Sequence, residues 1–477
     1  MLLRCLAWHR LPGCAVRRLP VGSSTLLARR RLTTTANGKQ AGDDGLGPLG
    51  KHIRDLILAT GPISVAKYMQ LALTSPVGGY YTRGQAFGRE GDFVTSPEIS
   101  QMFGEIMAVW FTLHWEMLGR PARTALVELG PGRGTLMDDM LRAAQRFPQL
   151  FASIRGIHLI ERSPELRRVQ HDRLGCDAQH TQMATDQDAP EHSVTAARGN
   201  IPVRWYDALD AVEPGSDCVP LVVAHEFFDA LPVHKFERGA DGLWHEILVD
   251  VADSTRTSPL IALPPGSVPQ RREPAAGSSH FKLARTHSVS AGAALLLRDK
   301  RFDSQFNAGD MVEVSPESAR VMAQIADWIT RCNGLGLVVD YGQDWTQGDT
   351  FRGIKSHRFA DPLCAPGSMD LTADVDFSYL RFAARGKAEC HGPVEQGAFL
   401  HAMGIQARLQ QLLQSTPDHA VQKSLVDCYR RLTDPLSMGR IYKMLAVLPL
   451  GSPVVPVPFA PPTKADLNTP KVEKIVK

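Results

Sequence analysis

The feature that most constrains the fold of this 477-residue chain is a glycine-rich turn that follows a short apolar segment. Residues 125–129 are apolar apart from Glu128, and glycine then recurs at every second position, as Gly130, Gly132 and Gly134. An amphipathic segment follows. Because glycine has no Cβ atom, its backbone approaches a ligand closely and adopts positive φ values. The pattern therefore predicts a strand, a loop that cradles a small molecule, and a helix.

The spacing of these glycines separates two classes of ligand. A dinucleotide-binding turn requires glycine at its first, third and sixth positions, and the sixth position here is Thr135. The sequence instead has the pattern acid-x-Gly-x-Gly-x-Gly. It resembles motif I of class I S-adenosylmethionine-dependent methyltransferases, in which the glycine loop holds the amino-acid part of the cofactor. A tight turn without any ligand is the alternative.

Composition narrows the class of protein further. The chain is 43% hydrophobic, and its net charge is only +3, with 53 basic and 50 acidic residues. The basic excess lies largely at the amino end, so the rest of the chain is near neutral and lacks the basic charge typical of nucleic-acid-binding proteins. No run of about 18 apolar residues occurs, so no membrane span is predicted. Eight cysteines without a CxxC pair and sixteen histidines without a His-Glu-x-x-His pair predict neither a metal site nor a disulfide framework.

The amino end has the composition of a targeting segment. Residues 1–42 lack Asp and Glu but contain several arginines and hydroxyl side chains. This composition is typical of a mitochondrial transit peptide and predicts import into the matrix; a disordered basic tail is the alternative. The remaining regions are predicted as follows: a helical amino-terminal lid at 43–120, a catalytic core at 121–449 with insertions at 176–200 and 252–310, and a disordered, proline-rich tail at 450–477.

From Arg123 onward, predicted strands alternate with predicted helices. Such alternation indicates an α/β fold, in which helices cover both faces of a parallel, Rossmann-like sheet. Two further strands, at 233–236 and 243–251, predict a β-hairpin that adds to the sheet or arches over its edge. The predicted strands of the parallel sheet are 125–129, 154–160, 203–206, 219–224 and 336–339.

Acidic residues stand at the ends of these strands. In open parallel sheets, ligands bind outside the carboxyl ends of the strands. Glu161 is therefore expected to accept hydrogen bonds from ribose hydroxyls, and Asp207 to lie at the adenine end of the same ligand. The alternatives are that Glu161 caps the helix beginning near Pro164 and that Asp207 is a turn residue. Asp340 adds another acid at a strand end.

Two further acids predict a binding site for a cation. Glu226 and Asp229 follow a buried strand and flank Phe227 and Phe228, where an unpaired carboxylate is costly. Carboxylates with aromatic walls suit a guanidinium group, which presents several N–H donors in one plane. The alternative is a structural ion pair with an internal arginine.

Several motifs in combination resemble the MidA family, over about residues 50 to 448. In that family the mitochondrial member is a protein arginine methyltransferase that assists assembly of respiratory complex I. One departure is His225, where the family usually has asparagine. The motifs that carry the resemblance lie at 61–69, 79–81, 91–100, 128–134, 225–233, 340–342 and 370–377.

The resemblance implies a class I methyltransferase fold and S-adenosyl-L-methionine as cofactor. The cofactor would be held by Glu128, Gly130, Gly132, Gly134 and Glu161. The implied reaction is symmetric dimethylation of an arginine in a core matrix-arm subunit of complex I.

In that reaction Glu226 and Asp229 would be the catalytic pair, orienting the guanidinium toward the methyl group. Two rival functions remain open at this point. One is methylation of a small amine, and the other is an assembly chaperone that binds the cofactor without turnover.

Overall fold

A computed structural model describes residues 46–82, 95–176, 194–197, 199–212, 218–252, 279–302 and 306–459. The predicted transit peptide at 1–42 lies outside the described residues. So do most of the insertion at 176–200, about half of the insertion at 252–310, and the tail beyond residue 459.

A central sheet confirms the predicted α/β fold. Within the described residues it contains nine strands, eight of them in the order β16-β17-β11-β6-β2-β3-β5-β4, with β15 paired to β11. Strands β2, β3, β5, β6 and β11 run parallel, whereas β4, β16 and β17 are antiparallel to their neighbours. The strands are β2 (Thr124–Leu129), β3 (Ile154–Ile160), β4 (Val194–Ala197), β5 (Ile201–Tyr206), β6 (Val219–His225), β11 (Leu335–Gln343), β15 (Val375–Asp376), β16 (Ala388–Glu395) and β17 (Tyr442–Pro449).

The strand order reverses next to β2. The chain proceeds from β2 to β3 and β5 on one side, and then returns to the other side of β2 for β6 and β11. A reversal of this kind opens a crevice at the carboxyl ends of the two strands that flank it. The glycine loop follows β2, and Glu226 follows β6, so both predicted sites lie at this crevice.

Alternating side chains on the buried strands fill two separate cores. Leu126 points to a face covered by α5, α6 and α12–α14, whereas Ala125 and Val127 point to a face covered by α10 and α11. Because helices cover both faces of the sheet, side chains that alternate between the two faces are apolar on each of them. The helices are α5 (Gln101–Met117), α6 (Thr135–Ala144), α7 (Pro148–Ser153), α8 (Pro164–Arg173), α10 (Pro316–Arg331), α11 (Phe377–Ala384), α12 (Gln396–Ala402), α13 (Ile405–Ser415), α14 (His419–Thr433) and α15 (Met438–Ile441).

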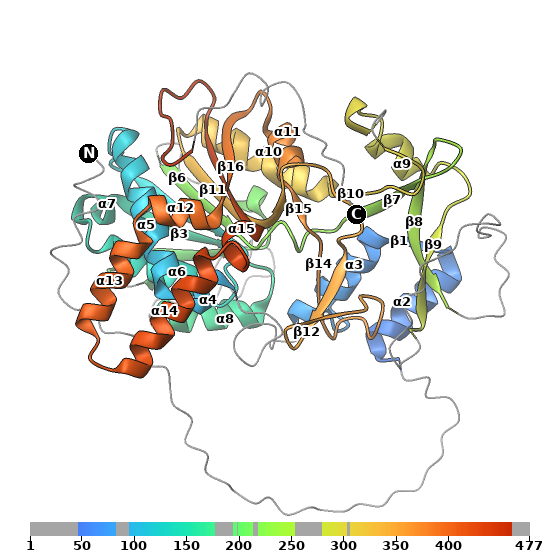
Figure 1. Ribbon diagram of the computed structural model, residues 1–477, viewed down its shortest axis with the longest axis horizontal. Helices are drawn as coiled ribbons and strands as arrows, with labels where there is room; N and C mark the ends of the chain where they lie inside the picture. Colours follow the sequence, from blue (N-terminus) through green and yellow to red (C-terminus); the bar gives the residue numbers. More distant parts are fainter. Residues whose placement is uncertain are drawn as a thin grey trace, which may run out of the picture.

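A second group of elements lies beside the central sheet (Figure 1). The predicted hairpin is present as β7 and β8, but it pairs with β1, β9 and β10 and does not extend the central sheet. The elements of this group are α2 (Pro48–Thr60), β1 (Ile63–Ser64), α3 (Val65–Thr74), β7 (His234–Arg238), β8 (Trp244–Val251), β9 (Phe281–Arg285), α9 (Ala291–Leu296), β10 (Met311–Val314), β12 (Arg352–Lys355), β13 (Arg358–Ala360) and β14 (Asp370–Thr372).

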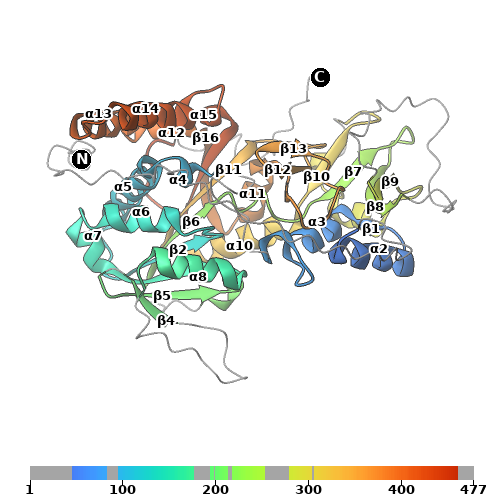
Figure 2. The same ribbon diagram turned by 90° about the horizontal axis from the view of Figure 1, so that it is seen from below.

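The predicted amino-terminal helical region, 43–120, is divided between the two groups. Helices α2 and α3 pack their apolar faces against β8, β9 and β14. Helix α5 instead packs against α6 and the carboxyl-terminal helices, and this packing buries every residue from Met102 to Trp115. Figure 2 shows α12–α15 as one layer next to α4 (Ser96–Ile99) and α5. None of the described helices combines the length and apolar composition needed to cross a membrane.

Candidate functional site

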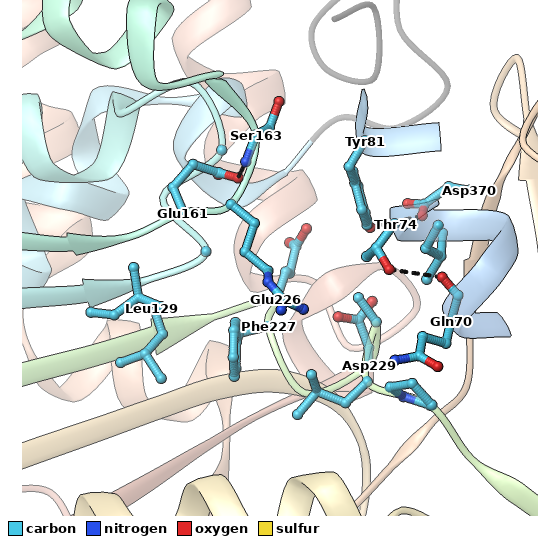
Figure 3. Close-up of a pocket in the computed structure, with 18 of the residues that line it drawn as sticks. Gln70, Thr74, Tyr81, Leu129, Glu161, Ser163, Glu226, Phe227, Asp229 and Asp370 are labelled. Atoms are coloured by element: carbon cyan, nitrogen blue, oxygen red, sulfur yellow. Dashed lines mark hydrogen bonds between the residues drawn. The ribbon is translucent and has the colours of Figure 1, made fainter. Parts of the chain in front are cut away.

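A cavity of about 1290 Å³ lies between the central sheet and the second group of elements (Figure 3). Its volume exceeds the roughly 300–1,000 Å³ that is usual for a single small ligand. Glu161 and Leu129 lie on one side in Figure 3, whereas Tyr81 and Asp370 lie on the other. Of the sequence-predicted residues, the cavity is lined by Glu128, Gly130, Gly132, Glu161, Asp207, Glu226 and Asp229.

The glycine loop is built from backbone conformations that other residues avoid. Gly130, Gly132 and Gly134 have φ values of 63°, 52° and 75°. A Cβ atom on Gly130 would stand 3.0 Å from the ring of Phe227. Gly134 does not line the cavity: it precedes α6, and a Cβ there would stand 3.4 Å from Gln170. The first two glycines therefore shape the cavity wall, and the third allows close packing behind it.

Thr135 replaces the sixth glycine of a dinucleotide turn and joins the loop to another segment. Its hydroxyl donates a hydrogen bond to Glu98 of α4. Glu98 lies in the motif at 91–100, of which residues 91–94 lie outside the described part of the chain. Both residues line the cavity, so α4 forms part of the wall beside the glycine loop.

Glu128 is a buried acid with an unused oxygen. Only 2% of the residue is exposed, and its Oε2 atom has no hydrogen-bond partner among the described residues. Burial raises the pKa of Glu128 to about 8. A buried carboxylate in this state is stabilised by a cationic ligand, and an ammonium group has the matching charge and donors.

Glu161 is oriented by its neighbours at the end of β3. Its Oε1 accepts the Ser163 N–H at 2.8 Å, and its Oε2 accepts Gln170 Nε2–H at 3.3 Å. Burial raises the pKa of Glu161 to about 7, although these hydrogen bonds oppose the rise. The cap of α8 is the Ser163 hydroxyl, which accepts the Leu166 N–H, so the capping alternative for Glu161 is wrong.

Asp207 lies at the rim of the cavity. Its side chain is 53% exposed and accepts a hydrogen bond from Arg167 at 2.5 Å. The same arginine donates through Nε to the backbone oxygen of Glu161 at 2.7 Å. Arg167 therefore links the two acids that were predicted to contact opposite ends of a nucleoside.

Gln170 is a site residue that the sequence patterns did not reveal. Its Nε2 donates to the Gly132 carbonyl at 2.7 Å, and its Oε1 accepts from Trp205 Nε1 at 2.8 Å. It is fully buried on the inner face of α8, four residues after Leu166. A glutamine at a position where helical periodicity calls for an apolar residue was the one available signal.

The turn after β6 is held by Asp340. Glu226 has a φ of 49°, which is uncommon for a residue with a side chain. Asp340 Oδ2 accepts the backbone N–H groups of Phe227, Phe228 and Asp229 at 3.2, 3.0 and 3.3 Å. Asp340 is fully buried and does not line the cavity, so this acid at a strand end fixes the backbone of the turn.

The Glu226 carboxylate faces the cavity with one oxygen unused. It accepts hydrogen bonds from the Tyr442 hydroxyl and the Ser96 backbone, but Oε1 has no hydrogen-bond partner among the described residues. Burial, with the nearby charge of Asp229, raises its pKa well above the usual value. His225 Nε2 lies 3.5 Å away, but burial lowers the pKa of His225 to about 3, so this ring supplies no positive charge.

Asp229 is held in the same manner. Its Oδ2 accepts hydrogen bonds from the Tyr341 hydroxyl at 2.5 Å and from Thr372 at 3.0 Å, whereas Oδ1 has no partner among the described residues. Burial raises its pKa, and these bonds with the charge of Arg352 oppose the rise. Arg352 pairs with Asp374 at 2.7 Å.

Among the described residues no arginine or lysine is ion-paired with Glu226 or Asp229; Arg352, whose charge reaches Asp229, pairs with Asp374. Two carboxylates that line one end of the cavity thus each keep a buried oxygen without a partner among the described residues. Such a pair is suited to a cation with several N–H donors.

Comparisons with known proteins are consistent with this geometry. Residues 106–394 match the family model described as S-adenosyl-L-methionine-dependent methyltransferase. The chain is 37% identical to the mitochondrial protein arginine methyltransferase NDUFAF7 of Bos taurus, over 92% of each chain. It is 41% identical to the homologue of Drosophila melanogaster, over 85% of this chain and 86% of the relative. It is 36% identical to the Homo sapiens protein, over 87% of this chain and 86% of the relative.

A solved structure has the same fold. A protein from Burkholderia thailandensis, crystallised with S-adenosyl-homocysteine, superposes with a TM-score of 0.64 and 24% identity. The match covers 84% of this chain and 91% of that one.

Proposed function

This chain belongs to the S-adenosyl-L-methionine-dependent methyltransferase family, and from that premise we propose that it methylates arginine side chains of a mitochondrial protein. The observation that carries the choice of arginine is the pair of unused oxygens, Glu226 Oε1 and Asp229 Oδ1, at one end of the cavity. The names of the relatives support both the acceptor and the compartment.

The residues along β2 and β3 fit the cofactor. The unused Oε2 of Glu128 matches the ammonium group of a methionine moiety, and the backbone at Gly130 and Gly132 leaves room beside it. Glu161 would bind the ribose hydroxyls, and Asp207 at the rim would lie at the adenine end. When bound, S-adenosyl-L-methionine supplies a methyl group already activated by its sulfonium charge.

Glu226 and Asp229, which would bind the substrate arginine, then have three tasks. A guanidinium has a pKa of about 12.5 or more, so it enters the site protonated. Hydrogen bonds to Glu226 Oε1 and Asp229 Oδ1 would hold two of its nitrogens and concentrate the positive charge there, leaving the third nitrogen free to attack. The transfer breaks the S–C bond of the sulfonium, forms the N–C bond and releases one proton, and Glu226, whose pKa is raised by burial, would accept that proton.

The finer proposals follow from the resemblance to the MidA family. The product would be symmetrically dimethylated arginine, and the substrate a core subunit of the matrix arm of complex I, whose assembly needs the modification. The compartment would be the mitochondrial matrix. Helix α3, Tyr81 and Glu98, from the predicted lid region, line the cavity and would cover the bound arginine.

Mass spectrometry of mitochondrial proteins tests the proposal directly. Cells lacking the protein would be complemented with the wild type, with Glu226→Gln, or with the exposed control Glu165→Gln. We expect a dimethylated arginine with the wild type and the control, and at least a hundredfold less with Glu226→Gln, because a neutral amide cannot accept the proton. Calorimetry should give equal S-adenosyl-L-methionine affinities for all three proteins.

The same cells distinguish the rival functions. Normal arginine methylation with Glu226→Gln would refute the catalytic role of this residue. Complex I that assembles normally with the inactive variant would indicate a chaperone, and an unchanged methylarginine profile with an altered methylamine pool would indicate a small-molecule substrate.

A further inference from the structure

Strand β14 contributes to the acceptor end of the cavity from the second group of elements. Side chains two residues apart on a strand point to the same face. Thr372 uses this face to hold Asp229 Oδ2 at 3.0 Å, while Leu371 points the opposite way into the core formed with α2 and α3. Asp370 shares the face of Thr372 and lines the cavity.

The Asp370 side chain is held by an aromatic residue from a distant part of the sequence. The Tyr81 hydroxyl donates to Asp370 Oδ1 at 2.9 Å. The Tyr81 ring itself packs edge-on against Tyr80, with the ring centroids 5.3 Å apart. Both Tyr81 and Asp370 face Glu226 and Asp229 across the cavity in Figure 3.

Three carboxylates therefore converge on one volume from two sides. The charge of Asp370 is close enough to contribute to the raised pKa of Glu226. The Glu226 side chain is 7% exposed and Asp229 is 9% exposed, and each keeps an oxygen without a partner among the described residues. The repulsion between Glu226 and Asp229 is relieved by a cation that reaches both, and Asp370 lies on the wall that such a cation would face.

We propose that Asp370 is a third carboxylate that contacts the acceptor side chain and selects guanidinium over ammonium, with Tyr81 as its positioning residue. The inference rests on the proposed arginine methylation. A guanidinium carries five N–H donors spread around a plane, so it can bond to carboxylates on opposite walls at once. A lysine ammonium concentrates its donors on one atom and would satisfy one wall only.

Kinetics with a pair of peptides test the inference. The first peptide carries the arginine found by the mass spectrometry described above, and the second has lysine at that position. Asp370→Asn still accepts the Tyr81 hydrogen bond but loses the charge. We expect about a tenfold higher KM for the arginine peptide, a smaller preference for arginine over lysine in kcat/KM, and an unchanged Kd for S-adenosyl-L-methionine. Tyr81→Phe should raise the same KM about threefold.

A matched control and two contrary outcomes complete the experiment. Asp361 belongs to the same group of elements, does not line the cavity, and accepts the Leu363 N–H through its side chain, so Asp361→Asn should leave every parameter unchanged. An unchanged KM in both Asp370→Asn and Tyr81→Phe would overturn the inference, and so would an equal loss of cofactor affinity, since that indicates a structural role. A wild-type enzyme that methylates neither peptide would instead refute the proposed function itself.

Discussion

Glu128 shows how a single buried acid makes stability depend on pH. Its pKa is about 8 in the folded protein, and the ordinary value is 4.5. Below pH 4.5 the carboxyl is neutral in both states. Between pH 4.5 and 8 the unfolded chain releases the proton and the folded protein keeps it, so stability falls as pH rises, by at most about 1.4 kcal/mol per pH unit.

We expect Glu128→Gln to remove this dependence, because the amide does not ionise. Urea denaturation of the cofactor-free protein at pH 5 and pH 8 would measure it. The free energy of unfolding of the variant, relative to wild type, should be higher at pH 8 than at pH 5. The exposed control Glu165→Gln should show no such difference, and parallel pH profiles for wild type and Glu128→Gln would contradict the assignment.

Gly132 allows a direct test of the glycine loop. Its φ of 52° is strained for a β-branched residue, and Gly132 lines the cavity. Gly132→Val should weaken S-adenosyl-L-methionine binding at least tenfold in calorimetry. Gly119→Val is a matched control, since Gly119 has a φ of 88°, open space around its Cβ position and no place in the cavity wall. If both variants bind the cofactor like the wild type, the loop is not the cofactor site.

At the scale of elements, the turn between β6 and β7 depends on β11. Removing the Asp340 side chain leaves three buried N–H groups of the turn without their acceptor. Each unsatisfied group costs about 1–3 kcal/mol. We expect Asp340→Ala to lower the free energy of unfolding by about 3 kcal/mol or more and to abolish methylation.

Asp418→Ala is the control for that loss. Asp418 also accepts two backbone N–H groups, but at the exposed start of α14, where removal of a cap costs about 1 kcal/mol. Equal destabilisation of the two variants in urea denaturation would show that Asp340 has no special role in the turn.

Local sequence signals predicted the five strands β2, β3, β5, β6 and β11 of the central sheet but not β4, β15, β16 and β17. The apolar runs at 154–160 and 219–224 became β3 and β6, and the run at 336–339 lies within β11. The signals that predict them, an apolar run and the Gly, Pro and Ser residues that bound it, are local to each segment. The second sheet was not predicted, because it joins strands as distant as β1 and β8, and no local pattern specifies such pairing.

The candidate site was predicted in its chain-local parts only. Acids beside the glycine loop and in the turn after β6 were predicted as site residues, because an acid that follows an apolar strand can be recognised from the sequence alone. Tyr341, Thr372 and Asp370 received no individual role, although they lie in motifs that carried the MidA resemblance. Their partners are 112, 143 and 289 residues away, so only the folded chain brings them together.

At the scale of the whole molecule, one buried ion-pair network joins early and late parts of the chain. Glu105 of α5 pairs with Arg142 of α6 at 2.8 Å and with Arg408 of α13 at 2.7 Å. The Glu105 and Arg408 side chains are only 3% and 5% exposed. Removing one member of a buried pair leaves its partners charged in a low-dielectric core.

Glu105→Ala should therefore lower the free energy of unfolding by about 3 kcal/mol or more, measured by urea denaturation. Cofactor affinity should stay unchanged under conditions where the variant is folded, because Glu105 does not line the cavity. The exposed pair of Glu165 and Arg168 gives the comparison: Glu165→Ala should cost less than about 1 kcal/mol. A similar effect of both substitutions would argue against the network as a stabilising link.

The position of β17 has a consequence for chains that end early. This strand, at 442–449, is the last of the sheet to be synthesised, yet it lies between β11 and β16 and is buried along its whole length. A polypeptide terminated before residue 442 would leave the apolar edge of β11 open to pairing with strands of other molecules. It would also lack Tyr442, which holds Glu226. Termination just before residue 442 should thus yield aggregated protein rather than a shortened enzyme.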